Sequence, residues 1–428
     1  MKQIDRLFSW IKQLFNSKKT KKIESETHCN PTTKPISSTA PPPKVCTKTE
    51  IHEDLEEYLF SLYDLRYNLL TEQVEGRPKY TENVTPFTLI DKRTMNTMVI
   101  EARKNGVNCW DRDIERFLKS KYVKNYHPFY SYMDRLPKWD GTDRITPLAE
   151  RVDVAPVWIN GFRLWLLALT AQWMGVSNRC ANTLIPLLIS PKQGMSKSTF
   201  CRLLMPPELK EYYLDKFDFN AKANVETKLG QFGLINLDEF DRYSTTALAT
   251  LKNLVQLKEI TIRKAYASYF LQLGRIASFI GTSNQTELLK DPTGSRRFLC
   301  VEVKHIIDCS PIDHAQLFAQ LKQLVVEGER VWMNPTEEKD MQEHNKKFML
   351  IRPEQEVFHQ LFTIPTEGEE GTTAHTTTEI HRLLTKHNPT SMRGISVQHL
   401  GHTLSAMGIK RIHTKVGNKY IVIRKENP

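Results

Sequence analysis

The segment LLISPKQGMSKSTFCRLL, residues 187–204, contains residue types that bind the phosphates of a nucleotide. A short apolar run, typical of a strand, passes through a polar turn into an apolar-periodic segment, typical of a helix. In a phosphate-binding loop at such a junction, a lysine reaches the terminal phosphates and a hydroxyl binds Mg²⁺. We therefore expect ATP and Mg²⁺ as cofactors. The expected contacts are Gln193, Gly194, Met195, Ser196, Lys197, Ser198 and Thr199, with Ser198 also a metal ligand.

The glycine pattern of this loop is incomplete. In the pattern G-x-x-x-x-G-K-[ST], Pro191 and Ser196 occupy the two glycine positions, and Gly194 is the one glycine that remains in the loop. Taken alone, the segment is explained about as well by a helix cap from Ser196 or Ser198. The choice between the two interpretations depends on features further along the chain.

Two later apolar runs end in polar residues that would complete a nucleotide site. FGLINLDEFDRY is a predicted strand ending in Asp238 and Glu239, and RIASFIGTSNQ is another that delivers Asn284 at its carboxyl end, where ligands bind in open α/β sheets. Asp238 would hold Mg²⁺ through its water shell, and Glu239 would polarise the attacking water. Asn284 would orient the terminal phosphate or that water.

A pair of arginines follows in DPTGSRRFLCVEV. Arg296 and Arg297 lie on a turn before a further predicted strand, from which a guanidinium could reach the terminal phosphate held by a neighbouring subunit. Each feature has a structural explanation by itself, since acidic pairs cap strands and paired arginines are common on surfaces. Their order on three apolar strands favours nucleotide hydrolysis, with Glu239, Asn284, Arg296 and Arg297 as the catalytic candidates.

In combination, these segments resemble the virulence-associated E family of mobile-element proteins, which is related to the superfamily 3 helicases of the AAA+ class. The resemblance covers about 300 residues, 51–350, and is carried by RYNLLTEQVEGR, LPKWDGTDRI, QGMSKSTF, INLDEFD, IGTSN and DPTGSRRF. It implies an ATP-fuelled motor, commonly a homo-oligomeric ring, that works on DNA during replication of a plasmid, phage or integrated element.

The segment LKEITIRKAYASYFLQLGR lies between the acidic run and Asn284. Alternation of Ile260 and Ile262 predicts a strand, followed by Arg263, Lys264 and Tyr266. The resemblance implies that this region lines a ring pore and contacts single-stranded DNA, and a basic pair near an aromatic ring suits backbone and base contacts. A strand edge protected by solvated charge is the alternative.

The predicted fold class is α/β: an AAA+-type P-loop core with a parallel sheet, preceded by a mainly helical module and followed by a winged-helix-like domain. Leucines at three-to-four spacing from Leu55 predict the helical character of the first module. We expect the divisions to be an amphipathic basic helix over 1–20, a disordered linker over 21–50, the mainly helical module over 51–155, the P-loop ATPase domain over 156–350 and the winged-helix-like domain over 351–428.

The net charge of +11 is concentrated at the two ends of the chain. Residues 1–50 carry ten basic against four acidic side chains and residues 371–428 nine against two, so the part between them is close to neutral. Two predicted helices and a basic hairpin in the second region favour duplex DNA as its partner, with protein docking as the alternative. The helix over 1–20 could contact a partner, the body or, less readily, a membrane surface.

The remaining composition indicates a cytoplasmic protein. Seven scattered cysteines without a C-x-x-C pair argue for a reducing compartment and against structural zinc. The apolar segment 157–175 is interrupted by Arg163 and Gln172, which favours a buried helix over a membrane span. Two function classes stay open: a DNA motor, which Glu239 favours, and an ATP-dependent DNA-binding initiator or switch with little hydrolysis, which Ser196 favours.

Overall fold

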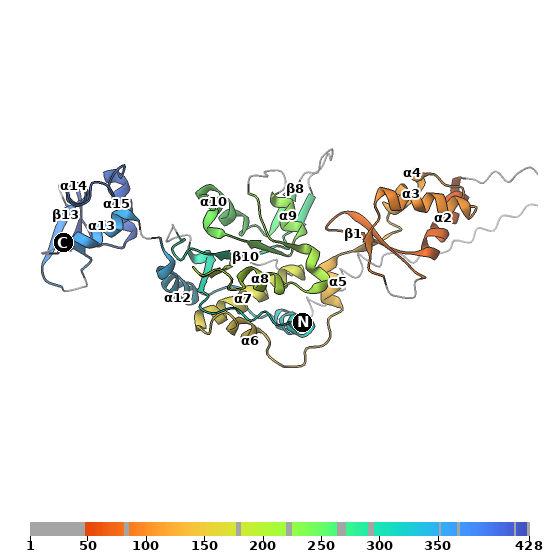
Figure 1. Ribbon diagram of the computed structural model, residues 1–428, viewed down its shortest axis with the longest axis horizontal. Coiled ribbons are helices and arrows are strands. Elements are labelled where there is room, and N and C mark those ends of the chain that lie inside the picture. The colour runs from red at the N-terminus through yellow and green to blue at the C-terminus, as the bar shows by residue number, and fades with distance from the viewer. Residues whose placement is uncertain are drawn as a thin grey trace, which may run out of the picture.

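The computed structural model describes residues 48–80, 85–176, 181–219, 225–262, 271–289, 295–350, 352–365, 369–414 and 417–425. The expected helix over 1–20 lies outside these residues, as does the expected linker except for its last three positions, which begin a helix. Arg263, Lys264 and Tyr266 also lie outside them. Figure 1 shows three groups of elements in chain order, from the orange N-terminal group through the central body to the blue C-terminal group.

The N-terminal group combines helices with a four-stranded sheet of order β3-β2-β1-β4, in which β1 pairs antiparallel with β2 and parallel with β4. The expected mainly helical module omitted this sheet. Leu65 continues the helical spacing of Leu62, but an ion pair of 2.5 Å between Arg66 and Glu75 joins the two central strands instead. The elements are α2 (Lys48–Leu62), β1 (Tyr63–Asn68), β2 (Gln73–Pro78), β3 (Thr88–Leu89), α3 (Lys92–Lys104), α4 (Asp111–Leu118) and β4 (Lys124–Tyr126).

The next two helices, α5 (Pro128–Asp134) and α6 (Ile145–Glu150), pack on the central body. The rings of Phe129 and Trp173 lie 4.8 Å apart between centroids, and the Trp158 indole N–H donates to the Ala149 carbonyl oxygen at 2.9 Å. The N-terminal group and the central body have different hydrophobic cores, and the division between these cores falls near residue 127, earlier than the expected boundary at 155/156. The LPKWDGTDRI segment interrupts the helices, but α5 before it and α6 after it pack into the same hydrophobic core.

The central body is built on a five-stranded parallel sheet of order β11-β5-β10-β7-β6. Its longer strands are buried on both faces, which is why they appear in the sequence as continuous apolar runs. The expected α/β class with a parallel sheet is confirmed. The strands are β5 (Ile185–Ile189), β6 (Tyr213–Leu214), β7 (Leu234–Leu237), β10 (Ser278–Ser283) and β11 (Phe298–Glu302).

Helices cover both faces of this sheet and bury two separate hydrophobic clusters. The longest, α7 (Pro156–Trp173), is almost wholly buried, as expected, and its Arg163 pairs with Glu329 at 2.5 Å. Among the described residues no helix combines the length and apolarity needed to cross a membrane. The other helices are α8 (Lys197–Leu203), α9 (Val225–Gln231), α10 (Thr245–Leu254), α11 (His314–Val326) and α12 (Pro335–Asn345).

A separate antiparallel pair, β8 (Glu259–Ile262) and β9 (Leu271–Gly274), lies outside this sheet and confirms the predicted strand. Arg275 lies at its base with a fully buried guanidinium that donates to the carbonyl oxygens of Val255 at 2.6 Å and Ala277 at 2.8 Å. Burial lowers the pKa of Arg275 to about 9. Because Val255 ends α10, the guanidinium joins the base of the pair to the negative end of that helix.

The C-terminal group has its own core, which includes Ile380, Leu400 and Val422. The two predicted helices and the hairpin are confirmed, and one helix and two strands before them, which the sequence did not indicate, complete the unit. The elements are α13 (Pro353–Leu361), β12 (Phe362–Thr363), β13 (Thr372–Thr376), α14 (Thr377–His387), α15 (Val397–Ala406), β14 (Arg411–Thr414) and β15 (Gly417–Arg424). Strand β15 pairs with the other three.

Candidate nucleotide-binding site

The predicted site residues Lys197 and Asn284 meet at the carboxyl edge of the central sheet. The Lys197 ammonium donates to the Asn284 Oδ1 atom at 2.9 Å and to the Ser190 carbonyl oxygen at 3.1 Å. Lys197 is 8% exposed. Burial lowers the pKa of its ammonium, and the negative charges of Asp238 and Asp241 limit the decrease. Its hydrogen-bond acceptors among the residues that the structure describes are neutral, so this mostly buried cation is suited to bind an anion.

The two predicted metal ligands are also in contact. The Ser198 hydroxyl donates to the Asp238 Oδ1 atom at 2.9 Å, and the Thr282 hydroxyl donates to the same oxygen at 2.5 Å. Hydroxyl and carboxylate oxygens are the ligands that Mg²⁺ prefers, and at nucleotide sites it commonly takes one or two protein ligands and completes its shell with phosphates and water. Ser198 and Asp238 together fit that requirement.

The loop between β5 and α8 has a left-handed backbone at two positions. Gly194 has φ +74°, and Ser196, at the second glycine position of the pattern, has φ +60° and ψ +20°. A side chain in this region costs about 1 kcal/mol, which explains why the pattern prefers glycine there. Ser196 makes no side-chain capping bond, and the Ser198 hydroxyl is bound to Asp238, so neither serine serves as the alternative helix cap.

Glu239, the expected water-activating residue, follows Asp238 at the end of β7. Its backbone is also left-handed, with φ +53°, and its Oε2 atom pairs with the Arg242 guanidinium at 2.8 Å. The carboxylate is therefore close to the site along the chain but engaged by a cation.

Asp241 was not identified from the sequence. Its Oδ1 atom accepts hydrogen bonds from the Ser283 hydroxyl at 2.8 Å and from the Asn284 backbone N–H at 3.4 Å. Asp241 thereby holds the end of β10 and fixes the position of Asn284. Two features of the sequence could have identified it. Asp241 is the third carboxylate of the DEFD segment, and hydroxyl residues directly precede Asn284.

The structure does not bring Arg296 and Arg297 to the phosphate loop of their own chain. They precede β11, whose Phe298 pairs with Ile185 at the start of β5. The loop follows the other end of β5, so about 20 Å of sheet separates the arginines from it at the usual rise per residue. The predicted catalytic groups thus lie at opposite edges of one sheet.

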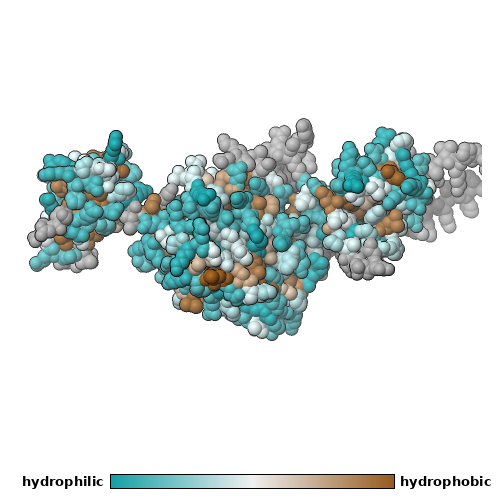
Figure 2. Space-filling view, in the orientation of Figure 1, coloured by the Kyte–Doolittle hydropathy of each residue, from teal (hydrophilic) through white to brown (hydrophobic). Residues whose placement is uncertain are grey.

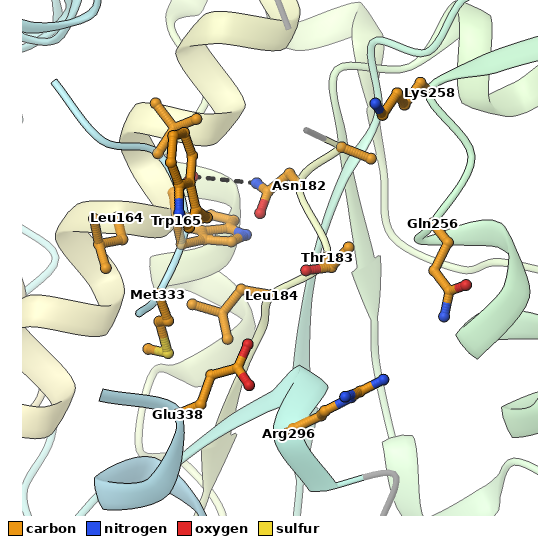
Figure 3. Close-up of a pocket in the computed structure, with 13 residues that line it drawn as sticks. Leu164, Trp165, Asn182, Thr183, Leu184, Gln256, Lys258, Arg296, Met333 and Glu338 are labelled. Atoms are coloured by element: carbon orange, nitrogen blue, oxygen red, sulfur yellow. Dashed lines mark hydrogen bonds between the residues drawn. The ribbon is translucent and has the colours of Figure 1, made fainter. Parts of the chain in front are cut away.

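Arg296 instead borders a pocket of about 360 Å³ at the amino edge of the sheet. Figure 3 shows Arg296 and Glu338 on different elements at one side of the pocket, with Asn182 and Trp165 above them in the view. The Asn182 amide donates to the Trp165 carbonyl oxygen at 3.2 Å, which fixes the back of the pocket. The exposed Arg296 side chain is available to a neighbouring molecule on this face.

Comparisons with known proteins give two family matches. The virulence-associated protein E-like domain matches residues 133–350, and a domain of unknown function described from a B. Theta gene (DUF3874) matches residues 352–422. No curated protein matches the chain.

Solved structures with some likeness include the apo structure of the NrS-1 C terminal region (305-718), with 11% identity and a TM-score of 0.46 over 89% of this chain and 100% of that one. The A form apo structure of the same region has 12% identity and a TM-score of 0.43 over 88% of this chain and 100% of that one.

The substitution Ser196→Gly should stabilise the protein by about 1 kcal/mol, because glycine adopts a left-handed backbone without steric cost. ATP turnover should be unchanged or higher. Thermal unfolding and a phosphate-release assay measure both quantities. Gly194→Ala is the matched control: an added Cβ would meet nothing within 4 Å, so only backbone strain is introduced and the melting temperature should fall. A large loss of turnover in Ser196→Gly would show that the serine hydroxyl itself is required.

Proposed function

Because the chain belongs to the family of the virulence-associated protein E-like domain, we propose that it is an ATP-hydrolysing, helicase-like DNA motor acting in the replication of a mobile genetic element. The observation that carries the proposal is the meeting of Lys197, Ser198, Asp238 and Asn284 at the carboxyl edge of a parallel sheet. The position of β10, between the strand that precedes the phosphate loop and the strand that precedes Asp238, supports the proposal of an AAA+-type core.

In this proposal each residue has a separate task. Lys197 exchanges its protein acceptors for oxygens of the terminal phosphates, and Ser198 and Asp238 hold Mg²⁺, which when bound neutralises phosphate charge. Glu239 accepts a proton from the water whose oxygen attacks the terminal phosphorus, while the bond from that phosphorus to the ADP oxygen breaks. Asn284, positioned by Asp241, donates from its amide to the phosphoryl oxygens or the water.

One observation favours the second candidate, an ATP-dependent DNA-binding initiator or switch with little hydrolysis. The Glu239 carboxylate pairs with the Arg242 guanidinium at 2.8 Å, and a nearby positive charge makes a carboxylate a weaker base. A protein in which this pair stays closed would bind ATP and assemble without turning it over. Measured turnover in the presence of DNA separates the two candidates.

Replacement of two site residues should give different defects. Lys197→Ala should abolish measurable ATP binding because it removes the cation that faces the phosphates. Glu239→Gln should keep ATP affinity and lower turnover by about 100-fold or more, because only proton transfer is lost. Calorimetric titration with ATP and a phosphate-release assay measure the two effects, and Arg202→Gln, a charge change on the exposed side of α8, is the control. Equal hydrolysis by Glu239→Gln and the unchanged protein would contradict the assignment.

We propose that Arg296 and Arg297 act on the nucleotide of a neighbouring subunit in a homo-oligomeric ring. A guanidinium at the amino edge of one sheet reaches a phosphate at the carboxyl edge of the next when subunits associate head to tail, and rotation about a common axis closes such an arrangement. An arginine supplied in this way stabilises charge on the transferred phosphoryl group and makes hydrolysis depend on assembly.

A mixing experiment tests the shared site. The double variant Arg296→Ala/Arg297→Ala and the variant Lys197→Ala should each be inactive, whereas their mixture should recover part of the activity at interfaces that combine an intact loop with intact arginines. Phosphate release measures the activity, and native mass spectrometry establishes that mixed assemblies have formed. A mixture that forms mixed rings and stays inactive would count against arginines supplied in trans.

We propose that two parts of the chain contact DNA. The segment between β8 and β9 in the sequence contains Arg263, Lys264 and Tyr266, which suit single-stranded DNA in a ring pore. The C-terminal group has a helix, two strands, two helices and a hairpin in succession, which is compatible with a winged helix, and we assign duplex DNA to it because of its excess of basic side chains.

Removal of residues 352–428 should weaken duplex DNA binding by about tenfold or more at moderate salt and flatten its salt dependence, because several phosphate contacts are lost. The cut precedes α13, since that helix shares the core of the unit with α14 and α15. Fluorescence anisotropy at a series of salt concentrations measures the effect, and hydrolysis without DNA should survive. Equal affinity of the shortened and full chains at every salt concentration would assign this unit to another partner.

A further inference from the structure

The strand order indicates on which side of the phosphate loop each end of a bound nucleotide lies. Relative to β5, β10 and β7 lie on one side and β11 on the other. Asp238 and Asn284 follow β7 and β10, so the terminal phosphate and its metal belong on that side of the phosphate loop. The rest of a nucleotide that follows the loop backbone then extends toward the side of β11.

The segment after β11 forms the wall on that side of the loop. The Ile307 backbone N–H donates to the Met195 carbonyl oxygen at 3.3 Å, and the Cys309 thiol lies 3.9 Å from the Ser196 carbonyl oxygen. Two successive residues of the phosphate loop, Met195 and Ser196, therefore contact this segment. Side chains that it exposes lie beside the path of a bound nucleotide.

A second loop, between α6 and α7, is fastened to the same wall. The Arg151 guanidinium donates to the Ser310 carbonyl oxygen at 2.8 Å, and the His305 Nε2 atom lies 3.3 Å from the Arg151 carbonyl oxygen. Arg151 also faces the Asp308 carboxylate at 3.9 Å. The two loops consequently form one surface, and Arg151 is occupied in holding them together.

Each of these loops exposes one aliphatic side chain. Val154 is 71% exposed and Ile306 is 68% exposed, although both are apolar. Figure 2 shows that the visible face of the central body is largely hydrophilic, with few strongly apolar side chains at its surface. Single exposed apolar residues are common, but here two of them occur on loops that are bonded together and to the phosphate loop.

We infer that Val154 and Ile306 form the subsite for the nucleobase of the bound nucleoside triphosphate. The inference rests on the proposed function. It adds recognition of the nucleobase, the part of the nucleotide that the phosphate contacts do not recognise. A flat, largely apolar base covers both side chains and removes them from water, which adds to the affinity supplied by the phosphates. Arg151 is a positioning residue for this subsite, because it holds the two loops together.

The test compares Mg-ATP with Mg-tripolyphosphate, which has the phosphate chain and lacks the nucleoside. In the double variant Val154→Ser/Ile306→Ser of the full chain, the dissociation constant for ATP should rise by about tenfold, because two apolar contacts with the base are lost. The constant for tripolyphosphate should not change, since serine is uncharged and does not touch the phosphates. Calorimetric titration measures both. The control is Ile100→Ser, which replaces another exposed aliphatic residue, on α3 of the N-terminal group.

The outcomes separate this inference from the function on which it rests. Unchanged affinity of the double variant for ATP overturns the subsite, and so does an equal loss for ATP and tripolyphosphate, which would mean that the loops only support the phosphate loop. If the unchanged protein binds neither ligand, the proposed function fails and the subsite with it. Thermal unfolding of the double variant, expected to match that of the control, shows that a selective loss of ATP affinity does not come from misfolding.

Discussion

The Asp238 carboxylate holds together the three elements on which the candidate site depends. Its Oδ1 atom accepts hydrogen bonds from Ser198, at the start of the helix after β5, and from Thr282, on β10. Asp238 itself directly follows β7. A single oxygen atom thus fixes the phosphate loop, the acidic strand and the strand of Asn284 at one edge of the sheet. Any change in the register of β10 would separate Lys197 from Asn284 and Thr282 from Asp238 together.

The parallel sheet also explains why the catalytic candidates fall into two groups. Residues that follow strands gather at the carboxyl edge, and Arg296 and Arg297, which precede a strand, are placed at the amino edge. A parallel sheet cannot bring the two groups together within one chain, whereas head-to-tail association of copies can. Arg275 adds a link in the same body, because its buried guanidinium joins the end of α10 to the base of the β8–β9 pair.

Much of the candidate site could be predicted from the sequence because buried parallel strands are continuous apolar runs with polar residues directly after them. Lys197, Asp238 and Asn284 were located in this way. Asp241 was missed because its role depends on a contact with the next strand along the sheet, which spacing within one segment does not reveal. Similarly, the N-terminal sheet was missed because Leu65 fits a helix, and cross-strand pairing rather than local spacing decides its conformation.

The most direct test of the account is the rate of ATP hydrolysis by the purified full chain with and without single-stranded DNA. If the residues at the carboxyl edge form an ATPase site coupled to DNA through the segment that contains Arg263 and Lys264, hydrolysis requires Mg²⁺ and is stimulated by single-stranded DNA. The variant Arg263→Ala/Lys264→Ala should then keep the basal rate and lose the stimulation. Absence of hydrolysis under all these conditions, by a folded protein, would contradict the assignment of this site to a DNA motor.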